Sequence, residues 1–502
     1  MRESDRKLYL ASVTDRYVRG DLSRRKFLRA ASKLGLGAGA LGLTATMPFG
    51  FRGGVFNTAA AAEINPDADM MAWLKDVAKP FAGQTIRLAT ESTPPSNAIN
   101  EHLKPFFEEA TGINVEIEVL PLEQVLQKLT LDVASGLGTY DLYYLDQSWM
   151  ASFSGDVLDP REKYAAKPDL AMPDYNFDDF LGPLVDGISM YDGIMVGVPY
   201  DIPIFIYMYR KDVYDELGLK VATTMDEFLA NAQAIQKAKG PDIYGTTGQM
   251  KSGHYSLECD WTAWLWGHGG SIFGPDQKFS GNDAEGLEAM DYWVRLKENM
   301  PPGVTSWTWD GQGQSVAQGI AGQVLSWGEF FPSWDNPDAS QVSGLMEAAI
   351  PPAPKALRTV EQTGFGEIPG VGHQGGSSLA VSKYSKSPDA AWLFAQWATS
   401  ADTQVFITTL GGGTGPTRTS VYDDARVKAN AKPGIPGTTR HLNVVRETID
   451  NYMGSEPDLP EWAELANDTI PVELGRFFAG EYDSAKAAMD SIAEKANKIV
   501  SG

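Results

Sequence analysis

Apolar residues recur with two different periods between residues 84 and 145. They alternate with polar residues over 84–90 and 114–120, which predicts two strands. Over 97–110 and 122–135 they return every three or four positions, which predicts two helices. A third apolar run, 140–145, predicts another strand. This order of strand, helix, strand, helix and strand is typical of a mainly parallel sheet flanked by helices.

The predicted strand ends indicate where a ligand would bind. In open parallel sheets, ligands bind beyond the carboxyl ends of the strands. The polar segment 91–97 follows the first predicted strand, and 146–149 follows the third. We therefore expect these two segments, the first as a loop, to face a ligand.

A second pattern of strands lies in 193–212. Apolar, β-branched and aromatic residues form two runs there, and Pro199 and Pro203 lie between them. Proline lacks the N–H that a central strand needs, so neither can lie mid-ladder. We expect the chain to leave one sheet near Tyr200 and to enter another near Ile204. The alternative is a strand pair within a single α/β domain.

The length of the chain indicates how many lobes or domains it forms, and its charge indicates which partners it does not bind. The 502 residues are more than one hydrophobic core usually serves, which favours two lobes or domains. The net charge is −23, and it becomes −30 without residues 1–62, which hold 11 Lys and Arg and 4 Asp and Glu. So acidic a chain repels nucleic acid and anionic lipid. Nucleic acid is therefore not an expected partner.

The N-terminus carries an export signal. Residues 23–29, SRRKFLR, resemble the twin-arginine signature, an apolar stretch follows at 34–47, and three alanines at 60–62 suit cleavage before Glu63. The alternative, a basic amphipathic helix, is disfavoured by four glycines in the stretch. Cys259 is the only cysteine, so neither an intramolecular disulfide nor a lipidated cysteine is expected. We predict a signal peptide over 1–62 and a periplasmic protein without an anchor.

Signs of catalysis are weak. The five histidines show no metal-ligand spacing, and the sequence has no nucleophile elbow, zinc-protease motif or phosphate-binding loop. We therefore predict a protein that is no enzyme and carries no cofactor or metal. Carboxylates are abundant, so a pair of them acting as an exported glycosidase stays open as an alternative.

Several segments together resemble the extracellular solute-binding proteins of ABC importers, of the carbohydrate type. The resemblance covers most of 84–502, although 425–456 fits it poorly. It rests on the order of the following segments: 111–115 (TGINV), 140–146 (YDLYYLD), 158–160 (LDP), 197–200 (GVPY), 209–212 (YRKD), 224–227 (TMDE), 320–327 (IAGQVLSW) and 375–386 (GGSSLAVSKYSK).

This resemblance implies an α/β fold of two lobes, each a mainly parallel sheet flanked by helices. Three hinge crossings would join the lobes, near 200–205, 350–355 and 416–420. The first lobe would comprise 84–200 and 355–416, and the second lobe 205–350 and 420–502.

The resemblance also implies a function and partners. The protein would be a monomer that captures a sugar, small oligosaccharide or polyol between its lobes and delivers it to the transmembrane subunits of an ABC permease. The twin-arginine machinery would export it. A polyamine or another small solute remains the alternative ligand, because carboxylates and indoles also suit an ammonium group.

Ten residues are candidates for ligand contact. Aromatic faces cover the C–H faces of sugars, and carboxylates accept hydrogen bonds from their hydroxyls. Core packing is the alternative for the tryptophans, a hinge role for the pair at the first crossing, and a plain turn for the glycines. The candidates are Asp146, Trp149, Tyr200, Asp201, Trp264, Trp266, Trp327, Glu329, Gly375 and Gly376.

Overall fold

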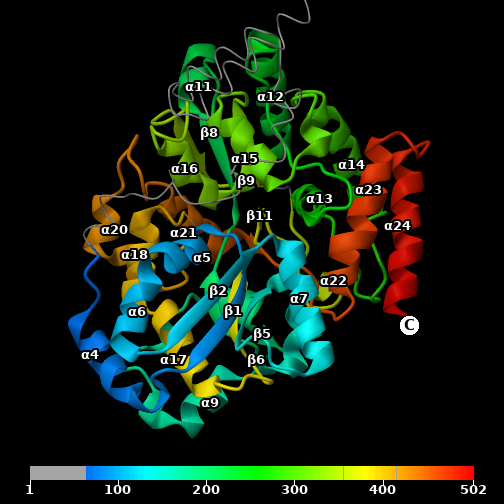
Figure 1. The fold of residues 1–502 in the computed structure, drawn as a ribbon. Helices are drawn as coiled ribbons and strands as arrows, with labels where there is room; N and C mark the ends of the chain where they lie inside the picture. The colour runs from blue at the N-terminus through cyan, green and yellow to red at the C-terminus, as the bar shows by residue number, and fades with distance from the viewer. Residues whose placement is uncertain (1–63, 354–355, 414, 502) are drawn as a thin grey trace, which may run out of the picture. The chain divides into compact units, whose positions relative to one another are not determined.

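The computed structural model describes residues 64–353, 356–413 and 415–501 (Figure 1). The predicted signal peptide, residues 1–62, lies outside them. In the first sheet, β1 (Thr85–Glu91) lies between β2 (Asn114–Leu120) and β3 (Leu142–Asp146) and is parallel to both. The parallel order predicted for this part of the chain is confirmed.

A later segment completes the first sheet. β12 (Ser377–Ser382), from the glycine-rich segment 375–386, pairs antiparallel with β3. It also pairs antiparallel with β4 (Val157–Leu158) and with β7 (Val198–Asp201). All six residues of β12 are buried, so the returning strand lies in the interior of the sheet.

The second sheet has three strands. β8 (Phe205–Arg210) lies between β9 (Gln323–Trp327) and β10 (Met346–Ala349), and both pairings are antiparallel. This differs from the mainly parallel sheet that we expected. Both partners of β8 come from much later in the chain and run against it, so no parallel strand–helix–strand unit forms here.

The chain passes from one sheet to the other through Pro203. β7 ends at Asp201 in the first sheet, and β8 begins at Phe205 in the second, as predicted. Pro199 does not lie between the strands: it belongs to β7, which pairs with β12, and there it lies opposite Ser378. Two hydrogen bonds tie later segments to this passage: the Gly375 N–H donates to the Pro203 carbonyl at 2.8 Å, and the Gly328 N–H to the Ile204 carbonyl at 2.9 Å. The other two predicted crossings and the lobe boundaries stay predictions.

The helices near the first sheet follow the predicted pattern, with one correction. Segment 91–97 is not entirely a loop, because α5 begins at Pro94, where proline suits the first helical turn, and the Thr93 side chain caps it. The helices of this part are α4 (Ala68–Val77), α5 (Pro94–Ala98), α6 (Lys104–Thr111), α7 (Leu122–Ser135), α8 (Met150–Phe153), α9 (Pro160–Ala166), α10 (Gly182–Leu184), α17 (Pro388–Ala398), α18 (Ala401–Leu410), α19 (Thr419–Asp423) and α20 (Ala425–Ala429).

The helices near the second sheet include one that is buried on every side. All residues of α13 (Tyr255–Gly267) are buried. α12 (Met225–Lys239) starts with the predicted capping box of Thr224 and Glu227. The others are α11 (Lys211–Leu217), α14 (Ala284–Lys297), α15 (Trp309–Ala317), α16 (Phe331–Asp335), α21 (Leu442–Tyr452), α23 (Ile470–Phe478) and α24 (Ala485–Val500). α22 (Trp462–Glu464) instead contacts the segment Gln147–Trp149, which follows β3 of the first sheet.

Two small sheets complete the architecture. β11 (Gly372–His373) pairs parallel with β13 (Met453–Gly454), and β5 (Met190–Tyr191) pairs antiparallel with β6 (Ile194–Met195). In Figure 1, β11 is drawn between the two larger sheets. None of the described helices has the length and apolar character needed to cross a membrane.

Candidate functional site

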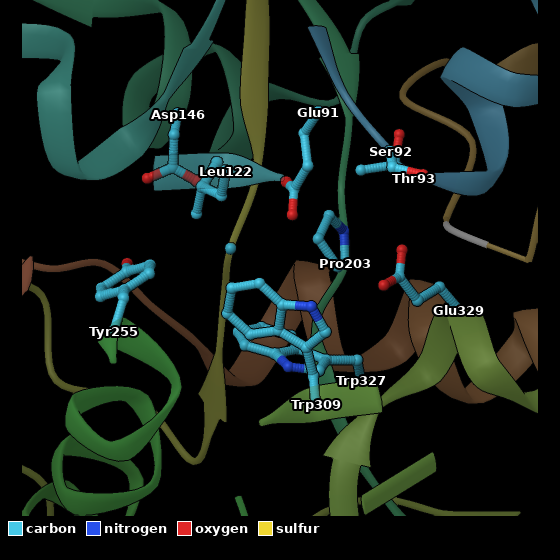
Figure 2. Close-up of a pocket in the computed structure, with 11 residues that line it drawn as sticks. Glu91, Ser92, Thr93, Leu122, Asp146, Pro203, Tyr255, Trp309, Trp327 and Glu329 are labelled. Atoms are coloured by element: carbon cyan, nitrogen blue, oxygen red, sulfur yellow. The ribbon is translucent and has the colours of Figure 1, made fainter. Parts of the chain in front are cut away.

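A pocket opens where the ends of strands from both large sheets meet (Figure 2). It encloses about 430 Å³, part of which is open to solvent. The first sheet supplies Glu91 at the end of β1 and Asp146 at the end of β3. The second supplies Trp327 at the end of β9, followed by Glu329. The other lining residues are Ser92, Thr93, Leu122, Pro203, Tyr255, Trp309 and Gly375.

Three carboxyl groups face this pocket. The Tyr144 hydroxyl donates to Glu91 Oε2 at 3.1 Å, and the Ser148 N–H and hydroxyl donate to Asp146 Oδ1 at 2.9 and 2.5 Å. Glu329 is 8% exposed, and within the described part of the chain its Oε2 has no hydrogen-bond partner. Buried oxygens normally accept a hydrogen bond, and the hydroxyl group of a ligand would be a suitable donor to this one.

Burial governs the protonation of these groups. It raises the pKa of Asp146 to about 7. Burial, and next the charges of Asp146 and Asp201, raise the pKa of Glu91 well above its usual value. Burial, and next the charges of Asp201 and Glu91, do the same to the pKa of Glu329. Burial and mutual repulsion therefore favour the protonated form of these carboxyl groups, and that form both donates and accepts hydrogen bonds.

Aromatic side chains form the opposite side of the pocket. Figure 2 shows the indoles of Trp309 and Trp327 across from Glu91 and Asp146. Trp327 packs edge-on against Phe205, with ring centroids 4.2 Å apart, and its Nε1 donates to Gln249 Oε1 at 3.2 Å. These contacts lie outside the pocket and fix the orientation of the ring.

Two of the aromatic residues of the pocket, Trp309 and Tyr255, come from helix N-termini. Trp309 starts α15, and its ring lies 4.6 Å from that of His254. Tyr255 starts α13, and its hydroxyl donates to the Glu456 carboxylate at 2.9 Å. Among the described residues that line the pocket, none is Lys, Arg or His. The arrangement suits a small ligand with several hydroxyl groups and apolar C–H faces.

The structure brings four of the ten predicted site residues to this pocket, namely Asp146, Trp327, Glu329 and Gly375. Trp149, Tyr200, Asp201, Trp264, Trp266 and Gly376 do not line it. The roles of all ten residues in ligand contact stay predictions.

The six residues away from the pocket lie in the interior. Trp264 packs near Phe228 and Tyr292, and Trp266 is fully buried, with its Nε1 donating to Glu367 Oε1 at 2.7 Å. Both belong to α13, which is buried on every side, so the core-packing alternative describes them. Trp149 is also fully buried, and the carbonyl of Gly376 accepts the N–H of Gln147 at 3.0 Å.

Asp201 and Tyr200 lie at the end of β7, behind the pocket. Both are buried, and the Tyr200 and Ser96 hydroxyls are hydrogen-bonded at 3.3 Å. The Asp201 charge contributes to the raised pKa of both Glu91 and Glu329. Asp201 thus acts on the pocket through its charge while its side chain stays outside the lining.

Sequence reasoning identified one edge of the pocket and missed part of the other. Glu91, Ser92 and Thr93 lie in a segment that the strand-end rule indicated, although they were not chosen as site residues. Tyr255 and Trp309 were missed. Each is the first residue of a helix, and this position was the one local signal that could have drawn attention to them.

Comparison with known proteins identifies the family of this chain. The family model for bacterial extracellular solute-binding proteins matches residues 89–405, more than half of the chain. The chain belongs to this family. As a member of a solute-binding family, it is a binding protein and not an enzyme.

Similar proteins cover most of this solute-binding protein. A mannitol-binding protein of Pseudomonas aeruginosa is 25% identical over 63% of the chain and 69% of its own length. A probable amino-acid ABC transporter periplasmic-binding protein of Sinorhizobium fredii is 25% identical over 71% of the chain and 78% of its own length.

A solved structure shows the same fold. It is an ABC transporter solute-binding protein from Agrobacterium radiobacter in complex with ribitol, and it is 25% identical to the chain. It has a TM-score of 0.73 and covers 84% of this chain and all of its own. The fold is thus the α/β fold of periplasmic binding proteins.

Proposed function

We propose that this protein captures a linear polyol or a small sugar for an ABC importer. The observation that carries the proposal is the pocket itself, in which three carboxyl groups face two indoles and none of the described lining side chains is positively charged. Vicinal hydroxyls pair with carboxyl oxygens, and C–H faces stack on indole rings. The mannitol-binding relative and the ribitol complex support this ligand class.

A cationic amine is the second candidate, because the same carboxyl groups would attract an ammonium group once ionised. A free amino acid fits less well. Its carboxylate would lie in a pocket whose described lining offers no Lys, Arg or His and whose carboxyl groups would repel it.

Calorimetry on the exported chain separates these candidates. The panel contains mannitol, ribitol, erythritol, maltose, putrescine and a neutral amino acid. We expect saturable binding of at least one polyol or sugar. Binding of putrescine alone, strengthening as the pH rises through about 7 and Asp146 ionises, would overturn the polyol assignment. Binding of the amino acid alone would overturn both candidates.

We further infer delivery and export steps. The transmembrane subunits of an ABC permease would receive the solute. The twin-arginine route would export the chain, with cleavage near Ala62. Support comes from the sequence SRRKFLR at 23–29 and from the family membership. Replacing Arg24 and Arg25 by Lys should leave the precursor in the cytoplasm, as cell fractionation would show; undiminished mature protein in the periplasm would contradict this route.

A further inference from the structure

Beside the pocket lies a buried cluster of four side chains with metal-binding atoms. Glu258 and Cys259 belong to α13, His373 to β11, and Glu456 follows β13. Their candidate ligand atoms all lie within 4.8 Å of one another. Three of the side chains are fully buried, and Glu456 is 3% exposed. Segments from three distant parts of the chain thus bring a thiol, an imidazole and two carboxyl groups together.

Hydrogen bonds hold Glu456 in place. The Tyr255 hydroxyl donates to its carboxylate at 2.9 Å, and Trp462 Nε1 donates to Oε2 at 2.7 Å. His373 Nε2 lies 3.0 Å from Oε1. The Glu456 side chain is therefore fixed before any ion binds.

Glu258 has an orphaned oxygen. Its Oε1 accepts from the Thr262 hydroxyl, whereas its Oε2 is buried and, within the described part of the chain, has no hydrogen-bond partner. No described Lys or Arg forms an ion pair with Glu258 or Glu456. A buried carboxyl group without a cation or a full set of donors is costly, and this one lies within reach of three other ligands.

We propose that Glu258, Cys259, His373 and Glu456 form a structural zinc site that links α13 to the β11–β13 sheet. Zinc binds thiolate, imidazole and carboxylate ligands in a tetrahedron, and closed sites of four protein ligands are structural. Calcium and magnesium prefer oxygen ligands alone, which disfavours both here. In a zinc tetrahedron the ligand atoms lie about 3.3–3.8 Å apart. A small contraction of the cluster would reach that geometry.

Zinc binding would exchange protons for the metal. Burial, and next the charge of Glu456, raise the pKa of Glu258, and burial likewise raises the pKa of the Cys259 thiol. On zinc binding, the protons of the Glu258 carboxyl and the Cys259 thiol pass to solvent. Tyr255 lines the pocket, and its hydroxyl donates to Glu456. By fixing Glu456, the ion would therefore also fix the position of Tyr255 in the pocket.

The test starts from the full exported chain. Because the site is buried, the metal must enter during folding. The protein is unfolded in denaturant with a chelator, desalted, and refolded with or without one equivalent of Zn²⁺. We expect one zinc ion per chain and a higher Tm in the zinc-loaded protein. Refolding with Co²⁺ should give a thiolate-to-metal charge-transfer band, which can only arise from Cys259, the single cysteine.

Two variants and a control locate the site. Glu258→Gln keeps the hydrogen-bonding shape, so it should fold but bind no zinc, and Cys259→Ser should lose the charge-transfer band. Glu464→Gln, at an exposed position in the same region, should behave as the wild type. The proposal is overturned if the refolded wild type holds no zinc and its Tm is the same with and without the metal. Equal zinc binding by wild type and both variants would overturn it as well.

Discussion

Two regions of this molecule bury carboxyl groups with opposite consequences. On α23, Glu473 is 2% exposed, and Arg476, Lys495 and Ser491 donate to it. Burial opposes its ionisation, but hydrogen bonds from Lys495, Tyr482 and Arg476 lower its pKa to about 2. In the pocket, the pKa of Glu329 is raised instead. The contrast teaches that hydrogen-bonding partners can outweigh burial, and that they distinguish a structural carboxylate from a carboxyl group that is free to bind a ligand.

The largest expected effect is the pH dependence of stability that the raised pKa of Asp146 causes. Because the pKa of Asp146 rises from 3.8 to about 7 on folding, its protonated form stabilises the fold below pH 4, and this contribution is lost as the pH rises to about 7. Relative to Asp146→Asn, the ligand-free wild type should lose up to about 1.4 kcal/mol of unfolding free energy per pH unit in that window. Urea unfolding between pH 4 and 8 measures it. Parallel curves for the two proteins would contradict the assignment.

Glu329→Gln tests the pocket side directly. We expect a loss of solute affinity of roughly 10- to 100-fold, because the amide nitrogen cannot accept the hydrogen bond that a carboxyl oxygen accepts, and a buried ligand hydroxyl left without its partner costs about 1–3 kcal/mol. The Tm of the ligand-free protein should change little, since an uncharged carboxyl group is replaced by an uncharged amide of the same shape. Calorimetry and thermal unfolding check both. A lower Tm with unchanged affinity would place Glu329 among the structural carboxylates.

Glu473→Gln should give the reverse result. Removing the charge breaks hydrogen bonds from Arg476 and Lys495, which should cost about 1–2 kcal/mol of stability at pH 7 and leave solute affinity unchanged. Because the pKa of Glu473 lies near 2, the wild-type advantage should be present above about pH 4.5 and fade as the pH falls toward 2. Denaturant unfolding at pH 3 and 7 measures this, and an advantage that grew toward acid would refute the argument.

The smallest expected effect concerns a tryptophan of the pocket compared with a tryptophan of the core. Trp309→Ala should weaken solute binding by about five- to tenfold through loss of a stacking face, or about 1–1.4 kcal/mol. Trp264→Phe, in the core beside Phe228 and Tyr292, should lower the Tm without changing affinity. Equal affinity losses in the two variants would show that the tryptophans of α13 reach the ligand after all.

The first sheet could be predicted well because its strands and helices follow one another closely along the chain, and each shows its own hydrophobic pattern. Alternation and helical spacing identified β1, β2 and α7, and the strand-end rule then indicated Glu91 and Asp146. The second sheet depends on pairings between β8 and strands more than a hundred residues away, for which the sequence has no local signature. Its antiparallel direction was therefore not predicted.

The tryptophans show the same limit at the level of side chains. Trp264 and Trp327 both lie in segments rich in aromatic residues, yet one is enclosed by α12 and α14 while the other faces the pocket. The spacing of residues along the chain shows which of them share a face of a helix, but it does not show which other elements cover that face. For α13 every face is covered, so no choice of positions along it would have identified a ligand contact except Tyr255 at its first turn.

The enclosure of Cys259 also makes the protein suitable for use as a sensor. It is the single thiol of the chain and is fully buried, so reagents in solution do not reach it in the folded state. A cysteine introduced at an exposed position such as Lys251, on the segment that leads into α13, would be the one site that a dye labels. An environment-sensitive fluorophore attached there would report solute occupancy without any need to remove native thiols first.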